Sequence, residues 1–345
     1  MSANRRVLIL GCGSAGLNTA LILQQEIPEL EVTLMAKDFP PHTTSDVAAG
    51  IFRPGSTFQA PTEELRHEWL AFSWDYYTKL RINEDQSQTG IIEMPCYILT
   101  SNEKTMFQFP FLSQRASGFR ECSKQELNVF QPPGKWVKGH YFRTMVIDNS
   151  RFLPWAMQRF TERGGKLISR QINSFEDRIL KEFDVVINCT GLGSKYLCPD
   201  RKMVPVRGQV VKVKAPWMKM AVYGDAESYI IPGVDYVTLG GTRNFNNYSL
   251  DAEPMETETI LKRACLMVPS LEKAEVVSER VGLRPHRHEV RLELETRSNG
   301  LKVVHNYGHC GYGVMASPGT SKHAVELVKE SLRTENKSWM DKHKL

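Results

Sequence analysis

The first thirty-six residues place the strongest constraint on the fold of this chain. Val7–Leu10 is a short, continuous apolar run, which is typical of a strand buried on both faces. A glycine turn, GCGSAG, follows it at once, and apolar residues at helical spacing continue from Leu17 to Gln25. Glu31–Met35 predicts a second strand. This order of strand, turn, helix and strand opens a doubly wound α/β sheet.

The three glycines have the spacing G-x-G-x-x-G of a dinucleotide-binding turn. Gly11 permits the tight turn, Gly13 lets the backbone approach a pyrophosphate, and Gly16 allows the helix to pack closely on the strand. The helix N-terminus carries partial positive charge toward the phosphates. The predicted cofactor-binding residues of this turn are Gly11, Cys12, Gly13, Ser14, Ala15 and Gly16.

The end of the second strand departs from this pattern. An Asp or Glu is usual there, because its carboxylate binds a ribose hydroxyl. This chain has Ala36-Lys37-Asp38, so either Lys37 or Asp38 would contact the adenosine side.

Three later segments are predicted to return to the same cofactor. TTSDVAAGI (43–51) offers hydroxyls for phosphate oxygens and small residues beside a flat ring, and DVVINCTGLGS (184–194) is a buried strand that ends in glycines. Glycines near the C-terminus, in HNYGHCGYGVMAS, precede a helix expected from about Ser321. The further predicted cofactor contacts are Thr43, Thr44, Ser45, Gly50, Ile51, Ile172, Gly311, Tyr312, Gly313 and Met315.

Composition excludes several classes of function. The net charge of +5 is spread along the chain without a basic block, so we expect no nucleic-acid partner. No apolar run approaches 18 residues, so we expect no membrane span. Seven cysteines form no C-x-x-C pair, and we therefore expect no metal site and a reducing compartment. The chain ends in HKL, which is similar to a peroxisomal address read by an import receptor; otherwise we expect the cytoplasm.

Seven stretches together resemble the D-amino-acid oxidase and D-aspartate oxidase family of flavoenzymes. They are GCGSAG, TTSDVAAG, DVVINCTGLGS, PVRGQVV, YIIPGVDYVTLGGTR, VGLRPHRHEVRLE and HNYGHCGYG, in the family's order from residue 7 to about 328. The resemblance implies non-covalently bound FAD in a Rossmann-like domain, and a substrate domain with a mixed β-sheet. The implied FAD-binding domain comprises 1–56, 149–202 and 276–330, the substrate domain 57–148 and 203–275, and the tail 331–345.

The resemblance also implies oxidative deamination of a D-amino acid by O2, which yields a 2-oxo acid, ammonia and hydrogen peroxide. FAD would accept the α-hydrogen of the substrate as hydride, so the protein's part is to orient the substrate, and no catalytic base is expected. Arg284 in VGLRP and Tyr229 in SYIIPG match the residues that bind the substrate α-carboxylate, and the backbone at Gly311 would receive the amino group. The two parallel N–H donors of a guanidinium suit a carboxylate.

Arg243 bears on the choice of substrate. In this family the pattern GGTR (240–243) is similar to that of D-aspartate oxidases, where the arginine faces the side-chain carboxylate. A second arginine of that group has no counterpart here, since its position holds Val222 beside Tyr223; Lys219 lies a little upstream. The main hypothesis is therefore an oxidase of acidic D-amino acids (D-aspartate, D-glutamate, N-methyl-D-aspartate).

Two alternatives stay open. Tyr223 matches a lid tyrosine of the oxidases that act on neutral D-amino acids, and Asp225 and Glu227 add negative charge near the entrance, which opposes an acidic substrate unless they point away. A flavin-binding protein without turnover is the third hypothesis. It rests on the altered loop GHCGYGVMAS, in which Cys310 and Met315 replace the usual glycine and threonine.

Overall fold

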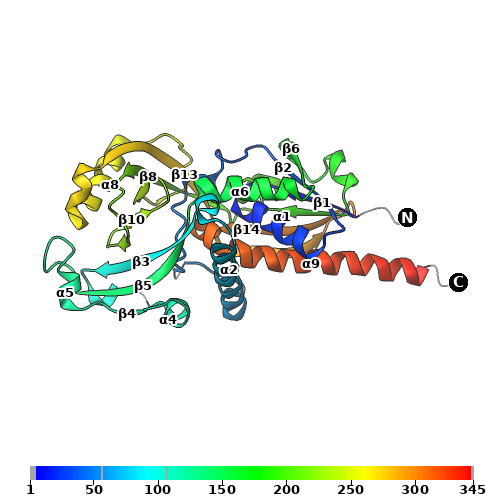
Figure 1. The fold of residues 1–345 in the computed structure, drawn as a ribbon. Helices are drawn as coiled ribbons and strands as arrows, with labels where there is room; N and C mark the ends of the chain where they lie inside the picture. The colour runs from blue at the N-terminus through cyan, green and yellow to red at the C-terminus, as the bar shows by residue number, and fades with distance from the viewer. Residues whose placement is uncertain (1–4, 56, 106–107, 343–345) are drawn as a thin grey trace.

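A single mixed sheet runs through the whole molecule. The computed structural model describes residues 5–55, 57–105 and 108–342. The sheet has 14 strands in the order β4-β5-β3-β9-β10-β11-β8-β13-β14-β7-β1-β2-β6, with β12 paired to β8 (Figure 1). This arrangement confirms the predicted α/β fold class.

The parallel half of the sheet contains the predicted dinucleotide-binding unit. Its strands are β1 (Arg6–Leu10), β2 (Glu31–Ala36), β6 (Lys166–Ser169), β7 (Val185–Asn188) and β14 (Lys302–His309). β1 lies between β2 and β7 and is parallel to both. Its apolar side chains are fully or almost fully buried, as the apolar run predicts for a central strand.

Three helices cover one face of this half in Figure 1, namely α1 (Ser14–Glu26), α6 (Asn149–Glu162) and α9 (Gly313–Lys342). α1 packs against both of the others. α6 is followed closely in the chain by the edge strand β6, which pairs with β2.

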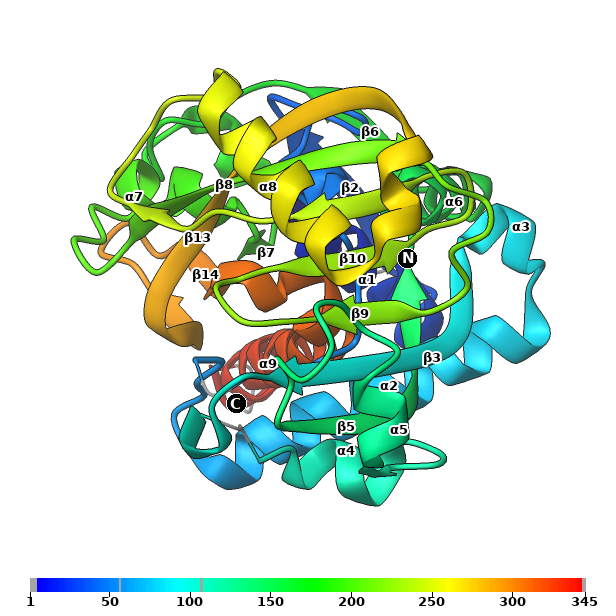
Figure 2. The same ribbon diagram turned by 90° about the vertical axis from the view of Figure 1, so that its left-hand side faces the viewer.

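The antiparallel half is built around two long strands, β8 (Val204–Lys214) and β13 (Glu275–Thr296). β13 pairs with β8 over its first half and with β14 over its second, so it joins the two halves of the sheet. Figure 2 shows this half with α8 (Pro254–Met267) in front of the sheet. The sheet is continuous across the expected domain boundaries, and the division into two domains stays a prediction.

The remaining elements connect these parts. The strands are β3 (Ile91–Thr100), β4 (Arg120–Glu121), β5 (Lys138–Ile147), β9 (Ala221–Tyr223), β10 (Tyr229–Pro232), β11 (Val237–Gly240) and β12 (Asn244–Phe245). The helices are α2 (Glu63–Asn83), α3 (Gln86–Thr89), α4 (Pro110–Arg115), α5 (Lys124–Leu127) and α7 (Ser194–Leu197). The short 3-10 turns are η1 (Thr44–Val47), η2 (Glu103–Thr105), η3 (Arg178–Glu182), η4 (Gly191–Gly193), η5 (Pro269–Lys273) and η6 (Cys310–Tyr312).

The last helix corrects one sequence expectation. α9 begins at Gly313, not near Ser321, and it continues through Pro318. A proline in a helix leaves the carbonyl four residues earlier without its usual donor. Here the hydroxyl of Tyr77, on α2, donates to the Val314 carbonyl at 2.6 Å and replaces that bond. α9 extends to Lys342, so most of the expected tail is helical, and the HKL ending lies outside the described residues.

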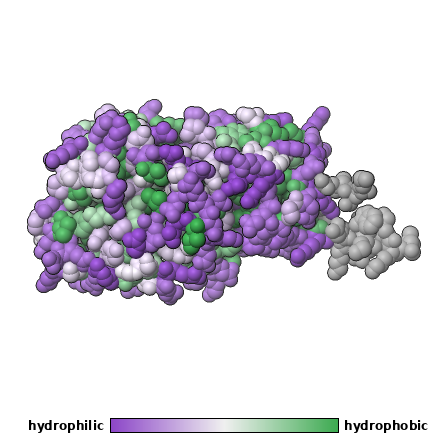
Figure 3. Space-filling model, viewed as in Figure 1, coloured by the Kyte–Doolittle hydropathy of each residue, from purple (hydrophilic) through white to green (hydrophobic). Residues whose placement is uncertain are grey.

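Hydrophilic residues cover most of the face shown in Figure 3, with hydrophobic residues in small groups. Among the helices that the structure describes, none has the length and apolar character needed to cross a bilayer. All seven cysteines are free thiols.

Candidate active site

A cavity of about 1160 Å³ lies where the two halves of the sheet meet. The glycine turn after β1, the segment from Pro41 to Arg53, and the turns after β7 and β14 line one part of it. Side chains from β9, β10 and β13 line another part. The structure brings together every residue predicted to bind cofactor or substrate except Gly16.

Gly11 and Gly16 have the packing roles that the sequence predicts. Gly11 adopts φ +100°, and a Cβ there would lie 2.5 Å from the Cys189 carbonyl oxygen of the next strand. A Cβ on Gly16 would overlap the carbonyl of Gly11. Gly16 therefore fixes the distance between helix and strand, and it has no place on the cavity wall.

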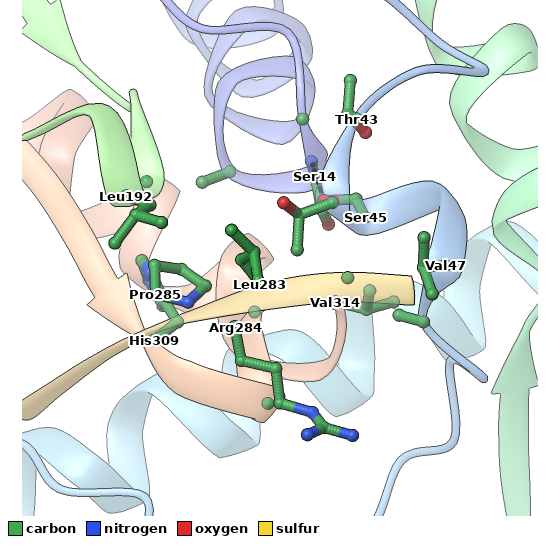
Figure 4. A pocket seen from close by; sticks show the side chains of 18 of the residues that line it. Ser14, Thr43, Ser45, Val47, Leu192, Leu283, Arg284, Pro285, His309 and Val314 are labelled. Atoms are coloured by element: carbon green, nitrogen blue, oxygen red, sulfur yellow. Dashed lines mark hydrogen bonds between the residues drawn. The ribbon is translucent and has the colours of Figure 1, made fainter. Parts of the chain in front are cut away.

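The N-terminus of α1 forms an anion cradle with the loop at 43–47. Gly13, at the N-cap position, provides no capping side chain, and the backbone N–H of Ser14 donates to the Ser45 hydroxyl at 3.0 Å. The first turn contains no acidic residue, so the positive end of the helix dipole is not neutralised there. Figure 4 shows Ser14 and Ser45 facing each other at the start of this helix.

The hydroxyl of the neighbouring Thr43 already donates a hydrogen bond within its own loop. Its backbone N–H and its hydroxyl both donate to the Asp46 carboxylate, at 2.8 and 2.6 Å. Burial, with a smaller contribution from Asp46, raises the pKa of the nearby Cys12 thiol to about 12. That thiol is therefore neutral at physiological pH, which suits a residue that packs beside a phosphate site.

Arg284 projects from β13 into the other part of the cavity. Figure 4 shows Leu283 and Arg284 leaving the strand on opposite sides, and Leu283 is on the side of Ser14 and Ser45. The guanidinium donates through Nη1 to the Thr242 carbonyl at 3.0 Å. A Cβ on Gly208, which pairs with Gly282 two residues before Arg284, would overlap the guanidinium. The missing side chain at Gly208 thus leaves the space that Arg284 occupies.

Tyr229 lies beside Arg284, and its ring occupies the space left by Gly240 and Gly241. The two glycines of the GGTR motif therefore accommodate the tyrosine ring. Burial raises the pKa of Tyr229, and the neighbouring Arg284 only partly opposes this. Its phenol stays protonated and can donate to a carboxylate. The Tyr223 ring follows, with ring centroids 5.6 Å apart.

Arg243 lines the cavity and forms an ion pair with Glu227, with Nη1 3.5 Å from Oε1. The two side chains are 34% and 53% exposed, so solvent weakens this pair. Glu227 lines the cavity too, whereas Asp225 is not on its wall and accepts a bond from the Ser101 backbone N–H at 3.0 Å. Of the two acids whose orientation the sequence left open, only Glu227 faces the site.

The position of the missing second arginine and the nearby Lys219 contribute no charge to the cavity. Val222 is fully buried in the hydrophobic core, and Lys219 is exposed away from the cavity. Lys37 and Asp38 both line the cavity and both are exposed, so either side chain can reach a ligand there.

Sequence reasoning missed two lining groups. The residues Thr190–Gly193, in the turn after β7, line the cavity; the sequence shows them as the glycine-rich end of a strand but gives no direct sign of contact with a ligand. Arg53 also lines the cavity, directly after the segment predicted to lie beside the flavin. The positive charge of Arg53 was the signal in the sequence that could have identified it, since an arginine is unusual so close to a run of small residues.

The fold and the cavity are those of a protein that binds a dinucleotide across the edge of a parallel sheet, with a second part of the cavity against an adjoining antiparallel sheet. The family model described as FAD dependent oxidoreductase matches residues 6–327, and the chain belongs to this family. The protein is an oxidoreductase, and its cofactor is FAD.

Sequence and structure comparisons agree with this assignment. The chain is 34% identical over 336 residues to D-aspartate oxidase of Homo sapiens, covering 95% of this chain and 97% of that one. It is also 34% identical over 336 residues to D-amino-acid oxidase of Dictyostelium discoideum, covering 94% and 92%. Glycine oxidase from Geobacillus kaustophilus has a similar fold, with a TM-score of 0.77, 20% identity and coverage of 94% and 95%.

The described residues fit FAD on structural grounds. The uncapped start of α1 and the Ser45 hydroxyl suit a pyrophosphate, and the cavity is long enough to reach from Lys37 and Asp38 to Arg284. Ala48, Ala49 and Gly50 add a small-residue wall between these ends. These segments would hold the cofactor, with its phosphates at α1.

Proposed function

We propose that this protein oxidises acidic D-amino acids, of which D-aspartate is the type substrate and D-glutamate and N-methyl-D-aspartate are related candidates. The reaction consumes the amino acid, O2 and water, and it yields a 2-oxo acid, hydrogen peroxide and ammonia, or methylamine in place of ammonia when the substrate is N-methyl-D-aspartate. Bound FAD supplies the two-electron chemistry, as acceptor of a hydride and donor to O2.

In this proposal the protein holds the substrate in one orientation. Arg284 and Tyr229 bind the α-carboxylate, because they lie side by side and both present N–H or O–H donors to the cavity. The backbone at Gly311, where a Cβ would lie 3.3 Å from Arg284 Cδ, is close enough to receive the amino group. No general base is assigned, since orientation and electrostatics are the protein's share of the work.

One observation supports acidic substrates above the others: Arg243 lines the same cavity as Arg284 and Tyr229. A second guanidinium in a pocket for a small amino acid favours a second carboxylate on the substrate. A neutral side chain would leave that charge with only the partly exposed Glu227 as its partner, whereas a second carboxylate would pair with it directly. The similarity to a D-aspartate oxidase agrees with this interpretation.

The experiment is peroxide release by the FAD-loaded protein, with D-aspartate and D-alanine compared at equal concentrations. A large preference for D-aspartate supports the proposal. In Arg243→Ala we expect acidic activity to fall while neutral activity is retained or rises. An equal fall for both substrates would indicate general damage and would leave Arg243 without a role in selection.

A specific observation favours a second candidate, an oxidase of neutral D-amino acids. Glu227 already neutralises Arg243 at the cavity wall. If this ion pair persists when substrate is bound, Arg243 has no free charge to offer the side chain of the substrate. A preference for D-alanine in the same assay would support this candidate.

We also propose that the protein is delivered to peroxisomes by an import receptor that reads its C-terminal HKL. A fluorescent protein fused to the N-terminus tests this. Peroxisomal fluorescence that is lost when the last three residues are removed would support the address, and diffuse cytoplasmic fluorescence of the intact fusion would refute it.

A further inference from the structure

Arg53 is a cation in the cavity to which the proposed function assigns no role. It follows the segment beside the flavin site and lines the cavity with Tyr223 and Tyr229. Its Nε atom is buried and has no hydrogen-bond partner. No carboxylate among the described residues forms an ion pair with it.

This sets Arg53 apart from Arg284 and Arg243. Arg284 donates to the Thr242 carbonyl and Arg243 pairs with Glu227. Arg53 instead stacks on a ring, with its Cζ 4.3 Å from the centroid of Tyr223. Burial works to lower the pKa of Arg53, but the facing phenols of Tyr223 and Tyr312 more than offset it, so the guanidinium stays charged.

The position of Arg53 points to the substrate and not to the cofactor phosphates. Its stacking partner, Tyr223, lies against Tyr229, which itself lies against Arg284. The anion cradle at Ser14 and Ser45 is built from other segments. A partly buried guanidinium with an unpaired Nε is expensive unless an anion completes its hydrogen bonds.

The segment that carries Arg53 is braced. Thr57 and Tyr312 join their hydroxyls at 2.8 Å, and the ring of Phe58 lies 5.7 Å from that of Tyr312. Tyr312 directly follows Gly311. Arg53 therefore lies near the point where the substrate amino group is expected, because the Tyr312 phenol faces it.

We propose that Arg53 binds the side-chain carboxylate of an acidic D-amino acid and is a determinant of specificity for the second carboxylate. This inference rests on the proposed function. It explains how the pocket recognises a dicarboxylate even while Glu227 neutralises Arg243, and without an arginine at position 222.

The test compares succinate with butyrate, two ligands of equal chain length that differ by one carboxylate. Binding to the FAD-loaded protein is measured from the change in flavin absorption. We expect the wild type to bind succinate more tightly than butyrate. In Arg53→Gln the ratio of succinate affinity to butyrate affinity should fall about tenfold, with butyrate affinity unchanged. Arg53→Lys, which keeps the charge, should recover part of it.

Arg143→Gln is the matched control, because Arg143 pairs with Glu93 and does not line the cavity. It should bind both ligands as the wild type does. The same ratio should appear in kcat/KM for D-aspartate against D-alanine. An unchanged ratio in Arg53→Gln, or weaker FAD binding as its only effect, would overturn the role of Arg53 and leave the proposed function standing.

A wild type with no preference for succinate or D-aspartate would instead refute the proposed function, and the role of Arg53 with it. If the Arg53 variants do not fold, a crystal structure of the wild-type holoenzyme with succinate decides the matter. A succinate carboxylate on the Arg53 guanidinium supports the inference, and a guanidinium without that contact overturns it.

Discussion

Arg284 and Arg243 line the same cavity, but the protein holds them in different ways. Arg284 rises from a long central strand, fills a space left by Gly208, and donates to a backbone carbonyl. Arg243 follows a strand end and is held by Glu227, a side chain that is 53% exposed. One cation is positioned by the sheet itself, and the other by an exposed side chain on a turn.

The difference separates two tasks. The α-carboxylate is common to all amino acids, so its ligand benefits from a fixed position. The choice between side chains rests on charges, and here it rests on an exposed pair whose energy is small. Changes at the Arg284 end should therefore affect every substrate alike, and changes at the Arg243 end should alter the ratio between substrates.

The largest effect is expected from Arg284→Gln. It removes the bidentate donor for the α-carboxylate, so kcat/KM should fall by on the order of a thousandfold for acidic and neutral D-amino acids alike. Steady-state peroxide assays with D-aspartate and D-alanine check this. A loss confined to one substrate would show that Arg284 and Arg243 do not divide the work as their surroundings suggest.

Gly240→Ala should reveal how far the Arg284 end of the cavity depends on the glycines beside Tyr229. A Cβ at this position would overlap the ring of Tyr229, which must then move away from Arg284. We expect kcat/KM to fall about a hundredfold for both substrates, while the flavin spectrum stays normal. In the double variant Gly240→Ala, Tyr229→Ala the glycine change should add no further loss; an additive loss would mean that Gly240 acts elsewhere.

At the other end, Glu227→Gln and Arg243→Gln should have opposite effects. Glu227→Gln frees Arg243, so the preference for D-aspartate over D-alanine should rise several-fold, by about 1 kcal/mol or less for an exposed pair. Arg243→Gln should lower the same ratio. If both variants change the ratio in the same direction, the pair acts as a structural unit and not as a selector.

The sequence predicted those parts of the molecule whose physical cause is local. A buried strand followed by G-x-G-x-x-G allows few structures, and the cradle at Gly11, Gly13 and Ser45 lies where the pattern predicts. Arg284 was assigned through a motif and does line the cavity with Tyr229.

The features that were missed depend on residues far apart in the chain. The start of α9 was misplaced because Pro318 usually ends a helix, and the compensating hydroxyl comes from Tyr77. The pairing of Arg243 with Glu227, and the unpaired state of the Arg53 Nε, are set by which charges the sheet brings together. Periodicity and spacing contain no information of that kind.

The smallest effect concerns pH. Burial raises the pKa of Tyr229 above its ordinary value near 10, so the phenol should remain a donor where an exposed tyrosine would begin to lose its proton. Any loss of butyrate affinity from Tyr229 ionisation should therefore begin at a higher pH than it would for an exposed tyrosine. Titration by flavin absorption checks this, with Tyr229→Phe as the control for ionisation of other groups. A several-fold loss of butyrate affinity near pH 10 that disappears in Tyr229→Phe would place Tyr229 in an open, hydrated site. The contrast between the buried Arg284 end and the exposed Arg243 end of the cavity would then fail.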